Sequence, residues 1–258
     1  SYSTGFKAGG TNADRIYPQF SQTFGPETST SIEFGYKGTI GERMQLSVAA
    51  YNTVFDDFQA NSFTGAGFNL QNAGEMEITG LEIEYTWFVM DNTKILGYFA
   101  FNQGEFNEFT GGTCWDAYPF HTGDPDPGLG PSGEPPCDRT GEDIPYNPRD
   151  RAQIGLDHTI PMGNNEMFIR LDYVWASELT TDGDNDPLTT QDSLGLLNMR
   201  VGMNIDSWNS TVTLWGRNMT DERYYAGSFD PPLLTPGRMN SYPAEPATYG
   251  ITFRKNWD

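Results

Sequence analysis

The stretch Asp192-Ser-Leu-Gly-Leu-Leu-Asn-Met-Arg-Val-Gly-Met-Asn-Ile205 decides the fold, because its side chains alternate in polarity. Its odd positions are apolar from Leu197 to Ile205, and its even positions there hold Asn, Arg, Gly and Asn. Successive side chains of a strand point to opposite faces, so this period of two predicts a strand with one apolar and one polar face. The same alternation appears over 44–50 and again over 248–254.

Segments of this kind recur along the whole chain, and none shows a helical period. We expect strands at 1–7, 29–40, 43–57, 76–90, 94–106, 150–161, 166–177, 192–205, 209–219 and 247–257. The gaps between them alternate between short and long. Short gaps fall at Ile40–Arg43, Asp91–Thr93, Pro161–Asn165 and Asp206–Trp208, and long gaps fall at 8–28, 58–75, 107–149, 178–191 and 220–246.

This alternation of gap length indicates an all-β, antiparallel up-and-down barrel that spans a membrane. Outer-membrane barrels keep short turns on the periplasmic side and long loops outside the cell. Several expected strands exceed the five or six residues usual in soluble proteins and suit a tilted strand that crosses a bilayer. Apolar side chains would then face lipid and polar side chains the lumen. A soluble β-protein, with the apolar face inward, is the alternative.

The composition and the net charge of the chain argue against some classes of function. Aromatic residues make up 14% of the chain, which also contains 29 Gly and 17 Pro, as expected for strands, turns and ordered loops. Acidic residues outnumber basic ones by 35 to 15, a formal charge of −20. Nucleic-acid binding depends on Lys and Arg to displace counterions, so nucleic acid is not an expected partner. No run of about 18 apolar residues exists, so we expect no transmembrane helix.

Five segments, in order along the chain, resemble the C-terminal half of TonB-dependent receptor barrels. They are Tyr2-Ser-Thr-Gly-Phe-Lys-Ala-Gly-Gly10, Pro26-Glu-Thr28 with Ile32-Glu-Phe-Gly-Tyr-Lys37, Asn72-Ala-Gly74 with Gly80-Leu-Glu-Ile-Glu84, Asn218-Met-Thr-Asp-Glu-Arg-Tyr-Tyr225, and Pro246-Ala-Thr-Tyr-Gly-Ile-Thr-Phe253. We interpret these motifs mainly as requirements of folding rather than as ligand contacts. The resemblance implies that residues 1–258 are about ten C-terminal strands of a 22-stranded barrel, with the plug domain and the earlier strands outside this sequence. A complete ten-stranded barrel is the structural alternative.

The resemblance also implies a function. Such a receptor lies in the bacterial outer membrane with its long loops extracellular, in contact with lipid and lipopolysaccharide. It takes up a scarce nutrient with energy delivered by TonB, which contacts the N-terminal region that is absent here. A ferric siderophore is the first expectation for the small-molecule ligand, followed by cobalamin, haem or an oligosaccharide. A passive porin or a structural barrel is the competing class.

Candidate ligand residues are aromatic side chains of two long loops, because such rings bind flat chelates or sugar faces by stacking. They are Trp115, Tyr118, Phe120, His121, Tyr224, Tyr225, Phe229 and Tyr242. Packing of these rings against each other or the plug is the alternative. Cys114 and Cys137 suggest a disulfide that closes the first loop and stabilises it by roughly 3 kcal/mol, although two free thiols are also compatible with the sequence.

Metal and catalytic sites have little support. Asp182, Asp184 and Asp186 have the spacing that begins a calcium loop, but Pro187 replaces the expected Gly and no Glu stands at the twelfth position. A solvated acidic loop tip is the alternative interpretation. His121 and His158 lack partners at zinc spacing, and no nucleophile motif is present, so we expect neither an enzyme nor a cofactor.

Overall fold

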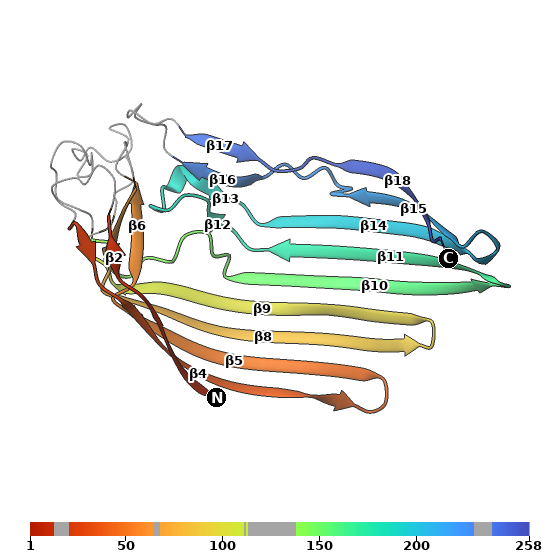
Figure 1. Ribbon diagram of the computed structural model, residues 1–258, viewed down its shortest axis with the longest axis horizontal. Coiled ribbons are helices and arrows are strands. Elements are labelled where there is room, and N and C mark those ends of the chain that lie inside the picture. Colours follow the sequence, from red (N-terminus) through yellow and green to blue (C-terminus); the bar gives the residue numbers. More distant parts are fainter. Residues whose placement is uncertain (13–20, 64–67, 111, 113–137, 230–238, 258) are drawn as a thin grey trace.

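The main element of the computed structural model, which describes residues 1–12, 21–63, 68–110, 112, 138–229 and 239–257, is a ten-stranded antiparallel sheet (Figure 1). Its strands are β1 (Tyr2–Lys7), β4 (Glu27–Ile40), β5 (Met44–Asp56), β8 (Glu75–Met90), β9 (Thr93–Glu108), β10 (Asp150–Met162), β11 (Asn165–Ala176), β14 (Leu194–Ile205), β15 (Ser210–Arg217) and β18 (Thr248–Lys255). All ten expected strands are confirmed.

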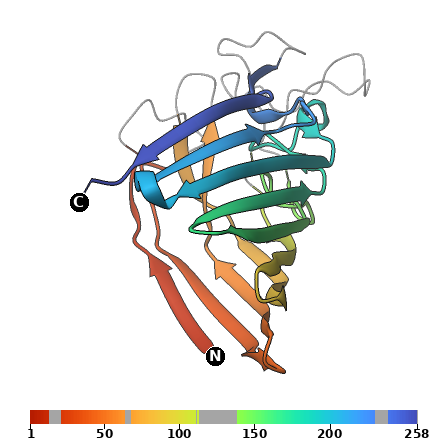
Figure 2. The ribbon, with the colours of Figure 1, turned by 90° about the vertical axis from the view of Figure 1, so that its right-hand side faces the viewer.

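Each strand of the sheet pairs with the next of these strands along the chain, so the topology is an up-and-down meander. The sheet is curved into an arc that is open between β1 and β18 (Figure 2). Within the described residues these two edge strands do not pair with each other. The ten strands therefore form a curved wall rather than a closed barrel.

The two ends of the sheet differ in the length of their connections, as the sequence predicts (Figure 1). At one end, tight turns include Gly41 and Gly163 in the left-handed region, with φ of 60° and 67°. We call the opposite end the long-loop end. In the described part of the chain, no helix is long and apolar enough to cross a membrane.

Within the described residues, the long connections contain four small hairpins where the sequence predicts only loops. They are β2 (Gly10–Thr11) with β3 (Thr23–Phe24), β6 (Gln59–Phe63) with β7 (Phe68–Asn72), β12 (Leu179–Thr180) with β13 (Thr190–Gln191), and β16 (Tyr225–Phe229) with β17 (Asn240–Pro243). Strands of two to five residues are too short for an alternation of polarity to stand out from the surrounding loop.

The register of the sheet places the apolar positions of the separate strands on one common face. One row of directly opposed residues crosses from β4 to β18 and contains only apolar, aromatic or glycine residues. It consists of Ile40, Met44, Trp87, Ile95, Leu156, Leu171, Met199, Gly216 and Tyr249. Many of the most exposed apolar side chains lie on this face, including Leu214 (54%) and Ile251 (73%). We call it the outer face.

The opposite, inner face is polar along most of its height. Lys37, Ser47, Glu84, Tyr98 and Gln153 form one row across it and border a cavity of about 490 Å³. At the long-loop end the inner face becomes apolar. A small core of buried side chains forms there, consisting of Ala60, Ala73, Met76, Phe106 and Phe109.

Three tryptophans near the short-turn end, Trp87, Trp208 and Trp257, are exposed. Trp208 lies in the 3-10 turn η3 (Asp206–Trp208), which connects β14 to β15. An exposed ion pair of 2.9 Å between Arg43 and Asp91 joins two neighbouring turns. Because both side chains are open to water, this pair contributes at most about 1 kcal/mol.

Replacing Leu214 by Arg would place a charge on the outer face of β15. We expect the change to destabilise the protein folded in phospholipid vesicles by about 2–4 kcal/mol, the range for a basic side chain at the middle of the lipid-facing surface of a barrel. Equilibrium unfolding in urea measures the difference. The matched control is Ser47→Arg on the inner face, where the new charge lies opposite Glu84. Equal destabilisation by both changes would contradict the assignment of the two faces.

Candidate functional site

Three connections from different parts of the chain meet at the long-loop end, and we call this group the long-loop cluster. It consists of segment 138–149, segment 177–193 and the hairpin β16–β17. The first segment runs beside the half of β9 that is nearer to the long-loop end. Ile144 N donates to Gly104 O at 3.0 Å, and Asn102 N donates to Arg149 O at 2.7 Å. The segment thus continues the pairing that β10 makes with the other half of β9.

Glycine at position 104 permits this arrangement. A Cβ atom there would lie 2.1 Å from Ile144 Cδ1, closer than two carbon atoms can approach. Ile144 therefore packs directly over the β9 backbone and against the small apolar core. The close approach fixes segment 138–149 to the sheet by contact as well as by hydrogen bonds.

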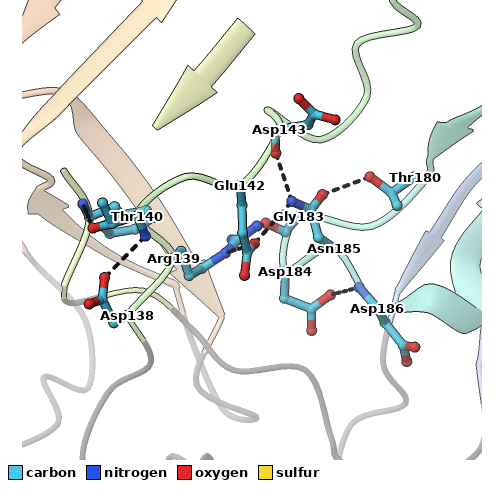
Figure 3. A network of polar contacts seen from close by, with 11 residues as sticks. Asp138, Arg139, Thr140, Glu142, Asp143, Thr180, Gly183, Asp184, Asn185 and Asp186 are labelled. Carbon is cyan, nitrogen blue, oxygen red and sulfur yellow. Dashed lines mark hydrogen bonds and ion pairs between the residues drawn. The ribbon is translucent and has the colours of Figure 1, made fainter. Parts of the chain in front are cut away.

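Arg139 joins the first two connections (Figure 3). Its side chain is buried, with 3% exposure of the residue. Its Nε donates to Glu142 Oε2 at 2.9 Å, and Nη1 donates to Gly183 O at 2.8 Å. The guanidinium carbon lies 5.5 Å from the ring centre of Phe106 and 5.8 Å from that of Phe109. The buried guanidinium group thus lies over two aromatic rings and donates hydrogen bonds to both segments.

Asn185 makes a second link between the same segments (Figure 3). Its Nδ2 donates to Asp143 O at 2.7 Å, and its Oδ1 accepts a hydrogen bond from Thr180 Oγ1 at 2.7 Å. The residue is in the left-handed region, with φ of 62°, a conformation that asparagine tolerates better than most residues. Tyr146 N also donates to Thr180 O at 3.0 Å.

The hairpin β16–β17 is attached through hydroxyl groups. Ser228 N donates to Thr181 O at 2.7 Å, and Thr181 Oγ1 donates to Ser228 Oγ at 2.9 Å. Ser241 on β17 is 2.9 Å from the same Ser228 hydroxyl. In addition, Tyr225 N donates to Gln191 Oε1 at 3.0 Å. The three connections therefore form one bonded unit.

The three aspartates considered for calcium accept hydrogen bonds from their own loop. Asp182 accepts from Gly183 N, and Asp184 Oδ1 accepts from Asp186 N at 3.1 Å. Asp186 Oδ1 accepts from Leu188 N at 2.8 Å and caps the 3-10 turn η2 (Pro187–Thr189). Among the described residues, no group of three His, Cys, Asp or Glu is arranged to hold a metal ion. Calcium binding by these aspartates stays the less favoured of the two interpretations of the sequence.

Burial raises the pKa of both Asp182 and Asp186 above the ordinary value of 3.8. For Asp182, the Gly183 N–H and Arg139 oppose this rise in pKa, and repulsion by Asp186 adds to it. Burial also raises the pKa of Tyr146, and the charges of Asp182 and Asp184 add to the rise. Burial therefore disfavours the ionised carboxylates of Asp182 and Asp186 in the folded loop.

A cavity of about 550 Å³ opens between the end of β9 and the first two connections of the cluster. Its lining is mostly polar and includes Asn102, Glu142, Asn147, Glu178 and Thr180. Such a surface suits a hydrophilic ligand that is held by hydrogen bonds. The aromatic residues predicted as ligand contacts do not line this cavity in the described part of the cluster.

The predicted aromatic residues of the second long loop lie in or next to β16–β17. Phe229 and Tyr242 stack on each other, with ring centres 5.4 Å apart and planes at 29°. Tyr225 is exposed, and Tyr224 O accepts a hydrogen bond from Ala244 N at 2.9 Å. Contact of these rings with a ligand stays a prediction. The other candidates, Trp115, Tyr118, Phe120, His121, Cys114 and Cys137, lie outside the described residues.

Several residues of the family-like motifs hold the connections in place. Glu27 Oε2 accepts from Gln59 N at 2.8 Å, and Asn72 Oδ1 accepts from Gly25 N at 2.6 Å. Asn218, in the left-handed region, donates from Nδ2 to Glu222 O and Glu245 O at 2.9 and 3.1 Å. These contacts support the interpretation that the motifs serve folding.

The family model described as "TonB dependent receptor-like, beta-barrel" matches residues 1–219. A search of curated proteins finds no match.

Three solved structures resemble the fold. The ferric yersiniabactin uptake receptor FyuA from Yersinia pestis has a TM-score of 0.75 at 19% identity, over 100% of this chain and 34% of that one. The siderophore receptor PiuA from Acinetobacter baumannii scores 0.69 at 16% identity, over 98% and 32%. The copper transporter OprC scores 0.66 at 13% identity, over 98% and 35%. The chain thus spans about a third of the length of these proteins.

Replacing Arg139 by Gln removes the cation that bonds two segments. We expect local opening of 138–149 and 179–191 to become easier by about 1.5–3 kcal/mol, the usual contribution of hydrogen bonds to a charged group. Amide hydrogen exchange across these residues measures the change. Arg223→Gln, a change at an exposed arginine, is the control and should leave the exchange as it was. Unchanged protection in Arg139→Gln would show that this side chain does not join the segments.

Lowering the pH from 7 should slow amide exchange in 179–190, after correction for the intrinsic pH dependence. A carboxyl whose pKa is raised by folding binds a proton more tightly in the folded state, so protonation stabilises the loop. The gain begins as the pH falls through the raised values and is complete below 3.8, the ordinary value. Asp182→Asn should show slower exchange at pH 7 and a weaker pH dependence. A loop that loosens between pH 7 and 4.5 would contradict this account.

Proposed function

Because the chain belongs to the family of TonB-dependent receptor-like β-barrels, we propose that it is part of an outer-membrane receptor that takes up a scarce nutrient. Proteins of this family lie in the outer membrane, and the similar structures are receptors and a transporter rather than enzymes. The observation that carries the proposal is the combination of an apolar outer face with three long connections bonded together at one end. A ligand could be captured there on the far side of a lipid layer.

The orientation follows from the lengths of the connections. Short turns on the periplasmic side and long loops outside are the rule in outer-membrane barrels. In the proposed receptor, the long-loop cluster therefore faces the outside of the cell. Trp87, Trp208 and Trp257 at the opposite end then lie at the periplasmic interface, where a ring can be buried while its polar edge stays hydrated.

We propose further that these strands are a portion of a larger barrel. The open edges of β1 and β18 would leave N–H and C=O groups unpaired in lipid, where each unpaired group costs several kcal/mol. Additional strands that close the wall remove this cost. In the proposed whole receptor, a plug domain fills a 22-stranded barrel, and TonB acts through the region preceding these strands.

A ferric siderophore is the ligand that we propose. In support, one of the similar structures is named as a siderophore receptor and another as a ferric yersiniabactin uptake receptor, whereas a third is named as a copper transporter. The exposed rings of Tyr225 and Tyr242, with the aromatic residues of 113–137, would provide stacking surfaces. The hydrogen bonds that attach β16–β17 to segment 177–193 would hold Tyr225 and Tyr242 in a fixed geometry.

The experiment is uptake of a radiolabelled ferric siderophore by cells with and without the gene, each in a TonB-positive and a TonB-negative background. We expect uptake only where both the gene and TonB are present. A panel of ferric siderophores, haem and cobalamin identifies the ligand. Equal uptake without TonB would support the alternative, a passive porin-like barrel. No difference for any nutrient on loss of the gene would reject transport.

A further inference from the structure

The cavity of about 550 Å³ in the long-loop cluster has an unusual lining for a small-molecule site. Among the described residues that line it, none is aromatic and only Ile144 and Leu179 have aliphatic side chains. The others carry carboxylate, amide or hydroxyl groups, apart from one arginine and one glycine. The cavity lies where β9 extends beyond β10 and segment 138–149 takes the place of that strand. It therefore belongs to the connections rather than to the inner face of the sheet.

Four carboxylate side chains line this cavity, those of Glu142, Asp143, Asp150 and Glu178. Glu142 is neutralised, because its Oε2 lies 2.9 Å from Arg139 Nε. Within the described residues, the other three side chains form no ion pair and accept no hydrogen bond. Three carboxylates of the cavity thus keep their full capacity to accept hydrogen bonds from a ligand.

The positive charge of the lining is smaller. Arg149 is the one basic residue among the described residues that line the cavity. Its guanidinium carbon lies 5.0 Å from the ring centre of Phe101, which is not part of the lining. One cation thus stands against three carboxylates without an ion pair. A hollow in which one sign of charge dominates raises the local concentration of ions of the opposite sign.

A buried amide oxygen points to a ligand independently of the carboxylates. Asn102 Oδ1 is buried and has no hydrogen-bond partner, and Asn102 lines the cavity. Its orientation is fixed, because Asn102 Nδ2 donates to Asn147 Oδ1 and Asn147 Nδ2 donates to Asn102 O, both at 3.2 Å. Buried acceptors without a partner are rare in folded proteins, since each one loses its bond to water. A ligand that brings N–H donors into the cavity would supply the missing partner.

We propose that this cavity binds a small organic cation that carries two or more ammonium groups. Each ammonium group combines a positive charge with three N–H donors, which matches a lining of carboxylate and amide oxygens. The volume of about 550 Å³ lies in the range of small-molecule sites.

The lining favours such a cation over a metal ion and over a flat chelate. Among the described residues, no three His, Cys, Asp or Glu are arranged to hold a metal ion. Carboxylates that are too far apart for one ion suit ammonium groups that are separated along a flexible chain. A flat chelate would need aromatic faces for stacking, and the described lining has none.

This inference deepens the transport proposal and rests on it for the meaning of the site. It adds a chemical requirement to the proposed nutrient, namely ammonium groups on the part that enters the cavity. Tyr225 and Tyr242 do not line the cavity, so they would contact another part of the same ligand.

The test measures binding of spermidine, a linear triamine, to the full-length receptor in a neutral detergent by calorimetry at pH 7. The variant removes the three free carboxylates and is Asp143→Asn with Asp150→Asn and Glu178→Gln. We expect its affinity for spermidine to fall at least about tenfold, as for the loss of hydrogen bonds to a charged group. An unchanged melting temperature would show that the variant is folded, since none of the three side chains bonds another described residue.

The matched control removes the same charge from exposed carboxylates of the long connections that do not line the cavity. It is Asp57→Asn with Asp192→Asn and Glu245→Gln. Because the whole chain is acidic, this control measures the general attraction of spermidine to the protein. We expect its affinity to stay within about twofold of the unmodified receptor.

A second variant, Asn102→Ala, keeps every charge and removes the buried acceptor. We expect spermidine to bind about twofold to tenfold more weakly, as for the loss of one hydrogen bond. Unchanged affinity in this variant would show that the amide oxygen does not contact the ligand and would overturn the assignment of the cavity.

Three further results would overturn the inference. They are a receptor that does not bind spermidine, equal affinity in the variant without the three carboxylates, and equal weakening in the control. Binding of maltotriose in place of spermidine, unaffected by the loss of the carboxylates, would assign the cavity to a neutral saccharide instead. Spermidine binding in detergent needs no TonB, so its failure is distinguishable from failure of the uptake experiment.

Discussion

The hydrogen-bonded register of the sheet is the constraint on which the rest of the structure depends. Side chains alternate between faces with a period of two, so a slip of one residue between two strands would exchange their inner and outer faces. The observed register keeps an unbroken apolar row from Ile40 to Tyr249. It also brings Arg200 and Trp215 opposite each other on the inner face. The two-sided character of the sheet is therefore a product of this pairing.

The long-loop cluster depends on the sheet through one local change of polarity. Along most of its height the inner face is polar, but at the end of β8 and β9 it carries Met76 and Phe106. Loops alone rarely bury enough apolar surface to be ordered. Here the sheet supplies apolar side chains on which the connections pack. The guanidinium group of Arg139 lies over the ring of Phe106 and donates a hydrogen bond to the second segment.

The sequence was sufficient to predict the ten strands because each is long enough to show its own alternation. The same signal failed for hairpins such as β16–β17, which have too few residues. Arg139 and Asn185 were missed for another reason: their partners, Gly183 and Asp143, are about forty positions away and are backbone carbonyls, which have no sequence signature. The charge of β14, β15 and β18 was visible in the sequence, but only the register shows that their arginines share a face.

The hydrogen bond from Arg139 to Gly183 has a consequence for the kinetics of recognition. Two segments that are bonded to each other and to the sheet lose their conformational freedom when the protein folds, and not when a ligand arrives. A ligand that contacts them then keeps more of its contact energy as affinity. Capture by such a surface is limited by encounter and orientation rather than by rearrangement, so differences in affinity between ligands would appear mainly in how long each one stays bound.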